Sequence, residues 1–201
     1  MEANLKPIAI ITGASSGVSL CGGKALIKRG WHVVLVCQNG KKAQEVARWF
    51  NFPEHSFEIM HLYWGSLESV RRFAKELKTT NRALDLLICN AATYMPLSKP
   101  PYRSPEGYEI SVAMNYLGHI LLCHLLIPNL NVAKVAHLII LGTVKTNSEE
   151  FGGRLRVPAP ANLGNFEGLK AGFKSPLSII NDSAFKAGKA YKHSKLSTMM
   201  M

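Results

Sequence analysis

The chain has 201 residues, of which 47% are hydrophobic, and its 24 Lys and Arg against 13 Asp and Glu give a net charge of +11. A chain of this length buries roughly 70% of its unfolded surface, so we expect one domain spanning residues 1–201. The charge favours anionic partners such as phosphates, acidic pigments or an anionic membrane surface. The basic residues form short pairs, such as Lys41-Lys42, which are typical of solvated helix faces, so no nucleic acid is expected.

The cysteines and histidines argue against a disulfide framework and a metal site. No two cysteines form a C-x-x-C pair, and the seven histidines lack a metal-ligand spacing. These features favour a protein of a reducing compartment, and no bound metal is expected. The cysteines are Cys21, Cys37, Cys89 and Cys123.

Two apolar segments bear on targeting. The run from Pro7 to Thr12 leads into a glycine-rich turn without a cleavage pattern, so no signal or transit peptide is expected. The run from Tyr116 to Leu130 contains histidines and a proline and is too short to span a bilayer, which predicts a buried helix. We therefore expect a cytoplasmic protein.

In chain order, short β-branched apolar runs alternate with longer helical patterns. Five such runs are expected to be strands, at 8–11, 32–36, 57–62, 84–89 and 136–141. The intervening patterns predict helices that end near 30, run to 49, and cover 66–77 and 106–126. Strands joined by helical crossovers form parallel sheets, so the fold class is α/β, a Rossmann-type doubly wound parallel sheet.

After Gly142 the pattern breaks. Residues 150–176 are rich in Gly and Pro, and we expect an insertion loop at about 146–188. Such a long irregular segment is either a functional lid or a disordered connection, and the lid is favoured. Helical character returns near Lys189.

The first strand leads into a turn of small residues that opens a helix. There the backbone can approach a pyrophosphate, and the helix N-terminus supplies free N–H groups. The position of this turn after the first strand of a βαβ series strengthens that interpretation. The residues expected to contact the nucleotide are Gly13, Ser15, Ser16, Gly17 and Val18.

The end of the second strand indicates which dinucleotide is preferred. Sites selective for NAD usually carry an acidic residue there, but residues 37–42 contain no carboxylate. Lys41 and Lys42 would instead attract a 2′-phosphate. The sequence therefore predicts NADP, with Lys42 as a contact.

A tyrosine and a lysine near the end of the chain form a candidate catalytic pair. Tyr191 and Lys195 are four residues apart, which places them on one helix face. An ammonium near a phenol lowers the phenol pKa toward neutrality, as proton transfer requires. We therefore expect Lys195 to lower the pKa of Tyr191.

These features occur in the order seen in the short-chain dehydrogenase/reductase family, which the chain resembles. The shared positions are Thr12-Gly13-x-x-x-Gly17, Asn90-Ala91-Ala92, Asn115, Thr143, and Tyr191 with Lys195. Within the family the chain is most similar to the light-dependent protochlorophyllide reductases, along nearly all of its length. The segments that carry this likeness include 104–108, 117–119, 171–174 and 189–192, and the long spacing between Thr143 and Tyr191 is the most discriminating.

The resemblance implies a light-driven reduction of protochlorophyllide in which NADPH supplies a hydride. Tyr191 would donate a proton or organise its donor, and Lys195 would hold the nicotinamide ribose. Asn115 and Thr143 would complete a polar relay, and Asn90 and Ala91 would contact the cofactor. The resemblance leaves open association with photosynthetic membranes and homo-oligomerisation.

The chain departs from the family pattern at several positions. Gln38, Tyr63, Ser19 and His193 stand where the family has an arginine, an aspartate, a glycine and an acidic residue. Only six residues follow Lys195, so the sheet is expected to be incomplete at its C-terminal end, in a truncated relative. The alternatives are a dark carbonyl or retinol-type reductase and a pseudoenzyme that binds nucleotide or pigment without turnover.

Overall fold

The computed structural model describes residues 6–78, 83–95, 101–143, 185 and 187–201. The chain divides into two compact units. The first contains the described parts of Met1–Tyr63, Ser69–Ala91 and Leu122–Leu141. The second contains the described parts of Trp64–Glu68, Ala92–Leu121 and Gly142–Met201.

The first unit is built on a five-stranded parallel sheet in the order β3-β2-β1-β4-β5. Its strands are β1 (Ile8–Thr12), β2 (His32–Cys37), β3 (Phe57–His61), β4 (Leu86–Cys89) and β5 (His137–Ile140). Every residue of β1 is buried, as expected of a strand at the centre of a covered parallel sheet. The predicted Rossmann-type sheet and its five strands are confirmed.

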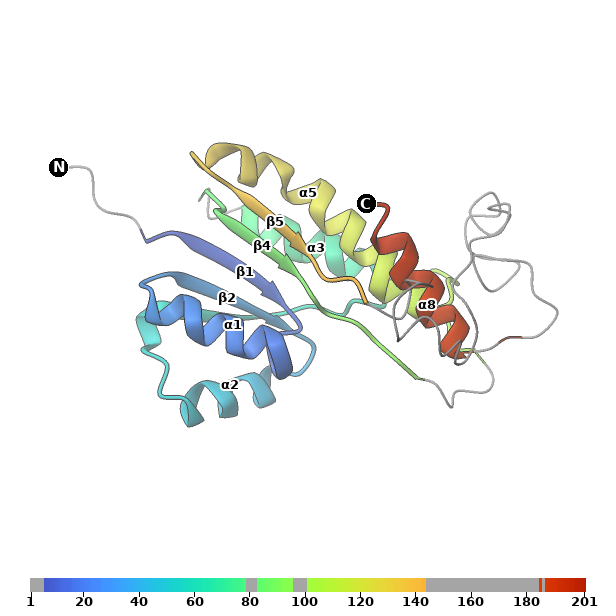
Figure 1. The fold of residues 1–201 in the computed structure, drawn as a ribbon, viewed down its shortest axis with the longest axis horizontal. Coiled ribbons are helices and arrows are strands. Elements are labelled where there is room, and N and C mark those ends of the chain that lie inside the picture. Colours follow the sequence, from blue (N-terminus) through green and yellow to red (C-terminus); the bar gives the residue numbers. More distant parts are fainter. Residues whose placement is uncertain (1–5, 79–82, 96–100, 144–184, 186) are drawn as a thin grey trace. The chain divides into compact units, whose positions relative to one another are not determined.

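Helices cover both faces of this sheet (Figure 1). On one face lie α1 (Gly17–Lys28) and α2 (Gly40–Trp49); on the other lie α3 (Leu67–Lys78) and the C-terminal part of α5 (Gly118–Val132). A core of buried apolar side chains lies on the sheet face that α1 and α2 cover. It includes Ala9, Ile11, Val33 and Leu35, with Leu20 and Leu26 of α1 packed against it.

Local hydrogen bonds explain where several elements begin and end. Gly30 has φ of +84° after α1; its N–H donates to Ile27 O, and the N–H of Trp31 donates to Leu26 O. This is the Schellman pattern that ends helices at a glycine. β4 starts two residues later than predicted, because the N–H of Leu84 donates to Asn129 O at 3.0 Å rather than to a strand.

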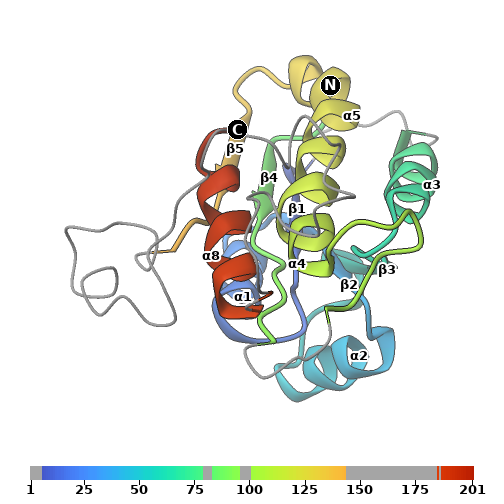
Figure 2. The same cartoon turned by 90° about the vertical axis from the view of Figure 1, so that its right-hand side faces the viewer.

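The second unit holds a helical run and the last helix of the chain. The run comprises α4 (Ile110–Val112), a π-helical turn η2 (Ala113–Leu117) and the start of α5. It begins at Ile110, later than the predicted 106, because the Glu109 carboxylate accepts a hydrogen bond from the N–H of Val112 and caps the helix. The last helix, α8 (Ala187–Thr198), packs against α4 and η2 (Figure 2).

The helical run is longer than its sequence suggested. Ile110–Val132 spans 23 residues with a mean hydropathy of 1.7, long and apolar enough to cross a bilayer by length and composition alone. The prediction of too short a segment considered residues 116–130 only, and the helix that contains them is longer. A buried helix of a globular protein passes the same test, and slightly more than half of the apolar window is buried.

The predicted insertion loop at 146–188 falls almost entirely outside the described residues. Its predicted end needs correction, since α8 already begins at Ala187.

Candidate active site

The predicted nucleotide turn lies in the first unit, at the carboxyl end of β1. Thr12 Oγ1 accepts hydrogen bonds from the N–H groups of Asn90 and Ala91, at 2.8 and 2.9 Å. Gly13 has φ of +68°, and a Cβ added there would lie 3.0 Å from Ala91 Cα. The turn therefore requires glycine at 13, both for its backbone conformation and for the close approach to Ala91.

The start of α1 fits an anionic group. Ser16 has an extended backbone and makes no side-chain cap, and Gly17, with φ of +59°, begins the helix. Ser16, Gly17 and Val18 are exposed, and Val18 retains 72% of its surface, while Ser15 is half-buried. Helix-start N–H groups without a side-chain cap are the arrangement that binds a phosphate.

Ser19 is accommodated at the position where the resemblance implies a glycine. Its side chain is buried, and its hydroxyl donates to Thr12 O at 2.9 Å. The Ser19 hydroxyl thus has a hydrogen-bond partner, and this bond connects α1 to the end of β1.

The end of β2 carries the predicted 2′-phosphate contact. Asn39 accepts a hydrogen bond from the N–H of Lys42 at 3.0 Å and caps α2, which places Lys42 in the first turn of that helix. The side chains of Lys41 and Lys42 are exposed, as is Gln38. Tyr63, where the resemblance implies an aspartate, donates its N–H to Ser69 Oγ at 3.1 Å.

The predicted catalytic residues lie in the second unit, where Asn115 is the centre of a hydrogen-bond network. Asn115 is fully buried in η2. Its Oδ1 accepts from the N–H of Thr93 at 2.8 Å, and its Nδ2 donates to Thr93 O at 3.1 Å and to Ser194 Oγ at 3.0 Å. Ser194 Oγ donates in turn to Tyr191 O at 2.7 Å. Asn115 therefore joins the segment after β4 to the helix that carries Tyr191.

Tyr191 has a raised phenol pKa. Burial raises its pKa, a hydrogen bond with the Thr143 side chain lowers it, and the neighbouring phenol of Tyr94 raises it. The phenol pKa is therefore raised where we expected it to be lowered, and the causes that act on Tyr191 do not include Lys195. Burial outweighs the favourable contact with Thr143 because the charged phenolate loses hydration.

Lys195 is almost fully buried, with 4% of its surface exposed. Its positive charge acts on His119, whose pKa falls to about 4, first through burial and second through Lys195. The His119 ring stacks on Trp64 with centroids 4.4 Å apart. A neutral imidazole therefore lies close to the Lys195 ammonium.

The structure adds functional candidates that the sequence did not reveal. Tyr94 packs its ring on Tyr191, with centroids 4.6 Å apart. Thr198 donates to Asn115 O at 3.0 Å, and Ser194 links Asn115 to Tyr191. The one sequence signal for Tyr94 is its position four residues after Asn90. No sequence pattern links residues 94 and 191.

The cysteines form one contact that their spacing conceals. Cys89 in β4 and Cys123 in α5 are both buried, and their Sγ atoms lie 3.6 Å apart as free thiols. No cluster of three His, Cys, Asp or Glu side chains that could hold a metal occurs in the part of the chain that the structure describes.

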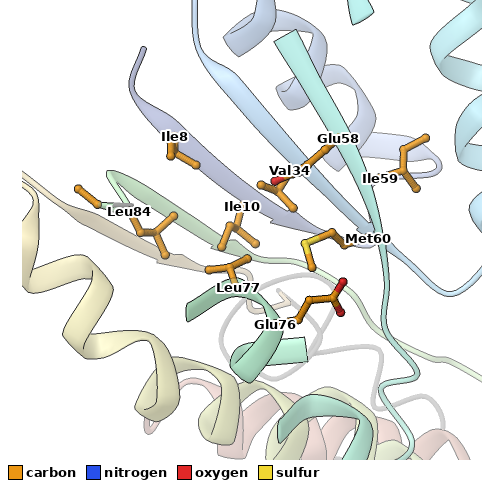
Figure 3. Close-up of a pocket in the computed structure, with 10 residues that line it drawn as sticks. Ile8, Ile10, Val34, Glu58, Ile59, Met60, Glu76, Leu77 and Leu84 are labelled. Atoms are coloured by element: carbon orange, nitrogen blue, oxygen red, sulfur yellow. The ribbon is translucent and has the colours of Figure 1, made fainter. Parts of the chain in front are cut away.

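A pocket in the first unit is lined by residues of β1, β2, β3 and α3 (Figure 3). Its volume is about 400 Å³; Ile8, Ile10 and Val34 contribute apolar surface, and Glu58 and Glu76 carry carboxylates. None of the residues predicted to contact the nucleotide is among the described residues that line it.

Comparison with known proteins places these features in a family. A family model for short chain dehydrogenase matches residues 7–153. The chloroplastic protochlorophyllide reductase of Chlamydomonas reinhardtii is 44% identical over 198 residues, which is 97% of this chain and 49% of that protein. That of Daucus carota is 42% identical over 200 residues, covering 97% and 50%. The chain thus spans about half the length of these relatives.

Solved structures share the fold at low sequence identity. A metagenomic short-chain oxidoreductase in complex with NADP has a TM-score of 0.67 at 18% identity, covering 98% of this chain and 73% of that one. A protein from Mycobacterium paratuberculosis has a TM-score of 0.69 at 24% identity, covering 98% and 62%. With the parallel sheet, the glycine turn beside Ala91 and the family model over 7–153, these findings show that the chain belongs to the short-chain dehydrogenase family.

Proposed function

We propose that this chain uses NADPH to reduce protochlorophyllide in the light. The observation that carries this proposal is the hydrogen-bond network that holds the half-buried Tyr191: Asn115 bonds Ser194, Ser194 bonds Tyr191 O, and the Tyr191 phenol has a hydrogen bond with Thr143. The raised pKa makes this phenol a weak acid, so it would give its proton only to a strongly basic carbon, such as the one left electron-rich when a hydride adds to the other end of a double bond. The relatives named protochlorophyllide reductase supply the substrate and the direction of the reaction.

The residues of the first unit fit a dinucleotide. The turn at Gly13, the start of α1 at Gly17 and the exposed Lys42 offer backbone N–H groups and a positive charge to phosphates. Asn90 and Ala91 are fixed by Thr12 and are the proposed contacts for the rest of the cofactor. When bound, NADPH supplies the hydride that goes to one carbon of the pigment double bond.

Tyr191 donates its phenol proton to the other carbon of that double bond. The Thr143 side chain stabilises the phenolate that remains, because its hydrogen bond lowers the phenol pKa. Lys195 adds a buried positive charge on the same helix, and Asn115 holds that helix in register through Ser194. The roles of Tyr191, Lys195, Asn115 and Thr143 remain predictions.

The pigment would act as its own photosensitiser, so no further chromophore is required. Relatives whose names include chloroplastic favour a plastid over the predicted cytoplasm. Membrane association and homo-oligomerisation remain predictions.

The test is to illuminate the 201-residue protein with protochlorophyllide and NADPH and to follow the pigment absorption spectrum. We expect a light-dependent shift to the spectrum of the reduced product, lost in Tyr191→Phe and retained in Tyr102→Phe. Tyr102 is a matched control because it is 62% exposed. Absence of a shift in the unmodified chain would contradict the proposed activity.

The other outcomes separate the alternatives. NADPH consumption with an aldehyde in the dark, without a pigment shift, would identify a carbonyl reductase of the same family. Pigment or nucleotide binding without turnover, unchanged in Tyr191→Phe, would identify a pseudoenzyme.

A further inference from the structure

Tyr94 lies against the proposed proton donor, and the predicted relay does not use it. The centroids of the Tyr94 and Tyr191 rings are 4.6 Å apart, and their planes are inclined by 53°. At this distance the two rings are in direct contact, within the range of favourable aromatic pairs. Tyr94 therefore restricts where the Tyr191 ring can lie.

Part of the Tyr94 side chain remains open to solvent. Tyr94 retains 45% of its surface, whereas Tyr191 is half-buried. One part of Tyr94 thus contacts Tyr191 while another part is available to a ligand. An exposed aromatic ring beside a proton donor is suited to contact the substrate that receives the proton.

The backbone before Tyr94 is held in place. Both the N–H and the C=O of Thr93 are bonded to the side chain of Asn115, at 2.8 and 3.1 Å. The same side chain bonds Ser194 in α8, whose Oγ donates to Tyr191 O. Tyr94 and Tyr191 therefore extend from two segments that a single buried amide joins, so their spacing is set before any ligand binds.

We propose that Tyr94 is a positioning and specificity residue of this site, which packs on Tyr191 and presents an aromatic surface on which a flat conjugated ring system stacks. This inference rests on the proposed function and adds the residue by which the site would prefer a flat conjugated substrate to small aliphatic carbonyl compounds. Stacking against an aromatic side chain favours any large flat ring, because every such ring has a π-face. The Tyr94 phenol also raises the pKa of Tyr191, consistent with their closeness.

The experiment compares Tyr94→Leu, Tyr94→Phe and the control Tyr102→Leu, using protochlorophyllide as the probe. Pigment binding is measured in the dark by the change in pigment fluorescence, and NADPH binding by the quenching of tryptophan fluorescence. We expect Tyr94→Leu to weaken pigment binding about tenfold, since a lost stacking contact has effects of this order. NADPH binding should stay unchanged, and Tyr94→Phe should restore pigment binding to within about twofold because the ring is retained.

Turnover in the light separates positioning from simple structural support. In Tyr94→Leu the KM for pigment should rise about tenfold with a smaller fall in kcat, again because a stacking contact is lost. A lower free energy of unfolding with an unchanged KM would show a structural role only and overturn the inference. If Tyr94→Leu does not fold, Tyr94→Gln replaces it, because a polar side chain suits a position that is 45% exposed.

Tyr191→Phe distinguishes this inference from the function on which it rests. If Tyr191→Phe loses turnover but Tyr94→Leu binds pigment like the unmodified chain, only the role of Tyr94 is wrong. If Tyr191→Phe keeps full turnover, the role of Tyr191 as proton donor fails, and if the unmodified chain shows no turnover, the proposed function itself fails.

Discussion

The Asn115 side-chain amide donates to Ser194 Oγ at 3.0 Å, which joins the π-helical turn η2 to α8 through two buried residues. The same serine hydroxyl donates to Tyr191 O. The position of the proposed proton donor therefore depends on a hydrogen bond between residues that are 79 positions apart in sequence.

Removing this link is expected to weaken the second unit. Ser194→Ala leaves Asn115 Nδ2 with only its bond to Thr93 O and should lower the free energy of unfolding by about 1–2 kcal/mol. Ser197→Ala is the matched control, because Ser197 is also buried but its hydroxyl donates only to His193 O in its own helix. Urea unfolding measures both variants, and an equal loss in the two would contradict the linking role of Ser194.

Thr12 is expected to control nucleotide binding through its hydroxyl. Thr12→Val keeps the shape of the side chain but removes the acceptor of two N–H groups, on Asn90 and Ala91, at a cost of about 2–4 kcal/mol in stability. Affinity for NADPH should fall as these residues shift. Thr12→Ser retains the hydroxyl and should bind NADPH nearly as the unmodified chain does. Titration of NADPH with each variant gives the comparison, and normal affinity in Thr12→Val would refute the role of the hydroxyl.

Gly13→Ala should be more harmful than Gly30→Ala. Both glycines have positive φ, so both substitutions carry a backbone cost of about 1 kcal/mol. An added Cβ at 13 would also lie 3.0 Å from Ala91 Cα, whereas one at 30 meets nothing within 4 Å. We expect Gly13→Ala alone to abolish measurable NADPH binding. Equal NADPH affinity in the two variants would show that the close approach to Ala91 is unimportant.

His119 should make the protein less stable in mild acid. Its pKa falls from 6.5 to about 4, so the unfolded chain binds more protons between these values and stability declines as the pH falls through this window. The full effect is on the order of 3 kcal/mol. His119→Phe keeps an aromatic ring against Trp64 but cannot titrate, so its stability should fall less between pH 7 and pH 4. Urea unfolding of both proteins measures how much stability each loses between pH 7 and pH 4. Equal losses in the two proteins would show that the pKa of His119 is not lowered by folding.

Tyr191 should stay protonated to an unusually high pH. Because its folded pKa is raised above 10, its contribution to stability is complete below the unfolded pKa and is lost as the pH rises through the folded pKa. The phenolate absorbance of the unmodified chain minus that of Tyr191→Phe should show a transition above pH 10. A transition near neutrality would instead support activation by Lys195.

The sequence predicted the elements that depend on local pattern. The alternation of apolar runs and helices was sufficient for the five parallel strands, because parallel neighbours require crossovers. The glycine turn after β1 was also visible, since its residues are adjacent in the chain. Element boundaries were less certain: the cap at Glu109 and the bond from Leu84 to Asn129 moved the starts of α4 and β4.

Only the tertiary structure decided how distant side chains meet. The spacing of Tyr191 and Lys195 suggested a lowered phenol pKa, but the direction depends on burial, which no local pattern reports. The contact of Tyr94 with Tyr191 and that of Cys89 with Cys123 join residues from separate segments. The sequence by itself determined which chemical groups are present and where the backbone turns, because these depend on near neighbours. Folding decided which groups are buried away from water and which groups contact one another.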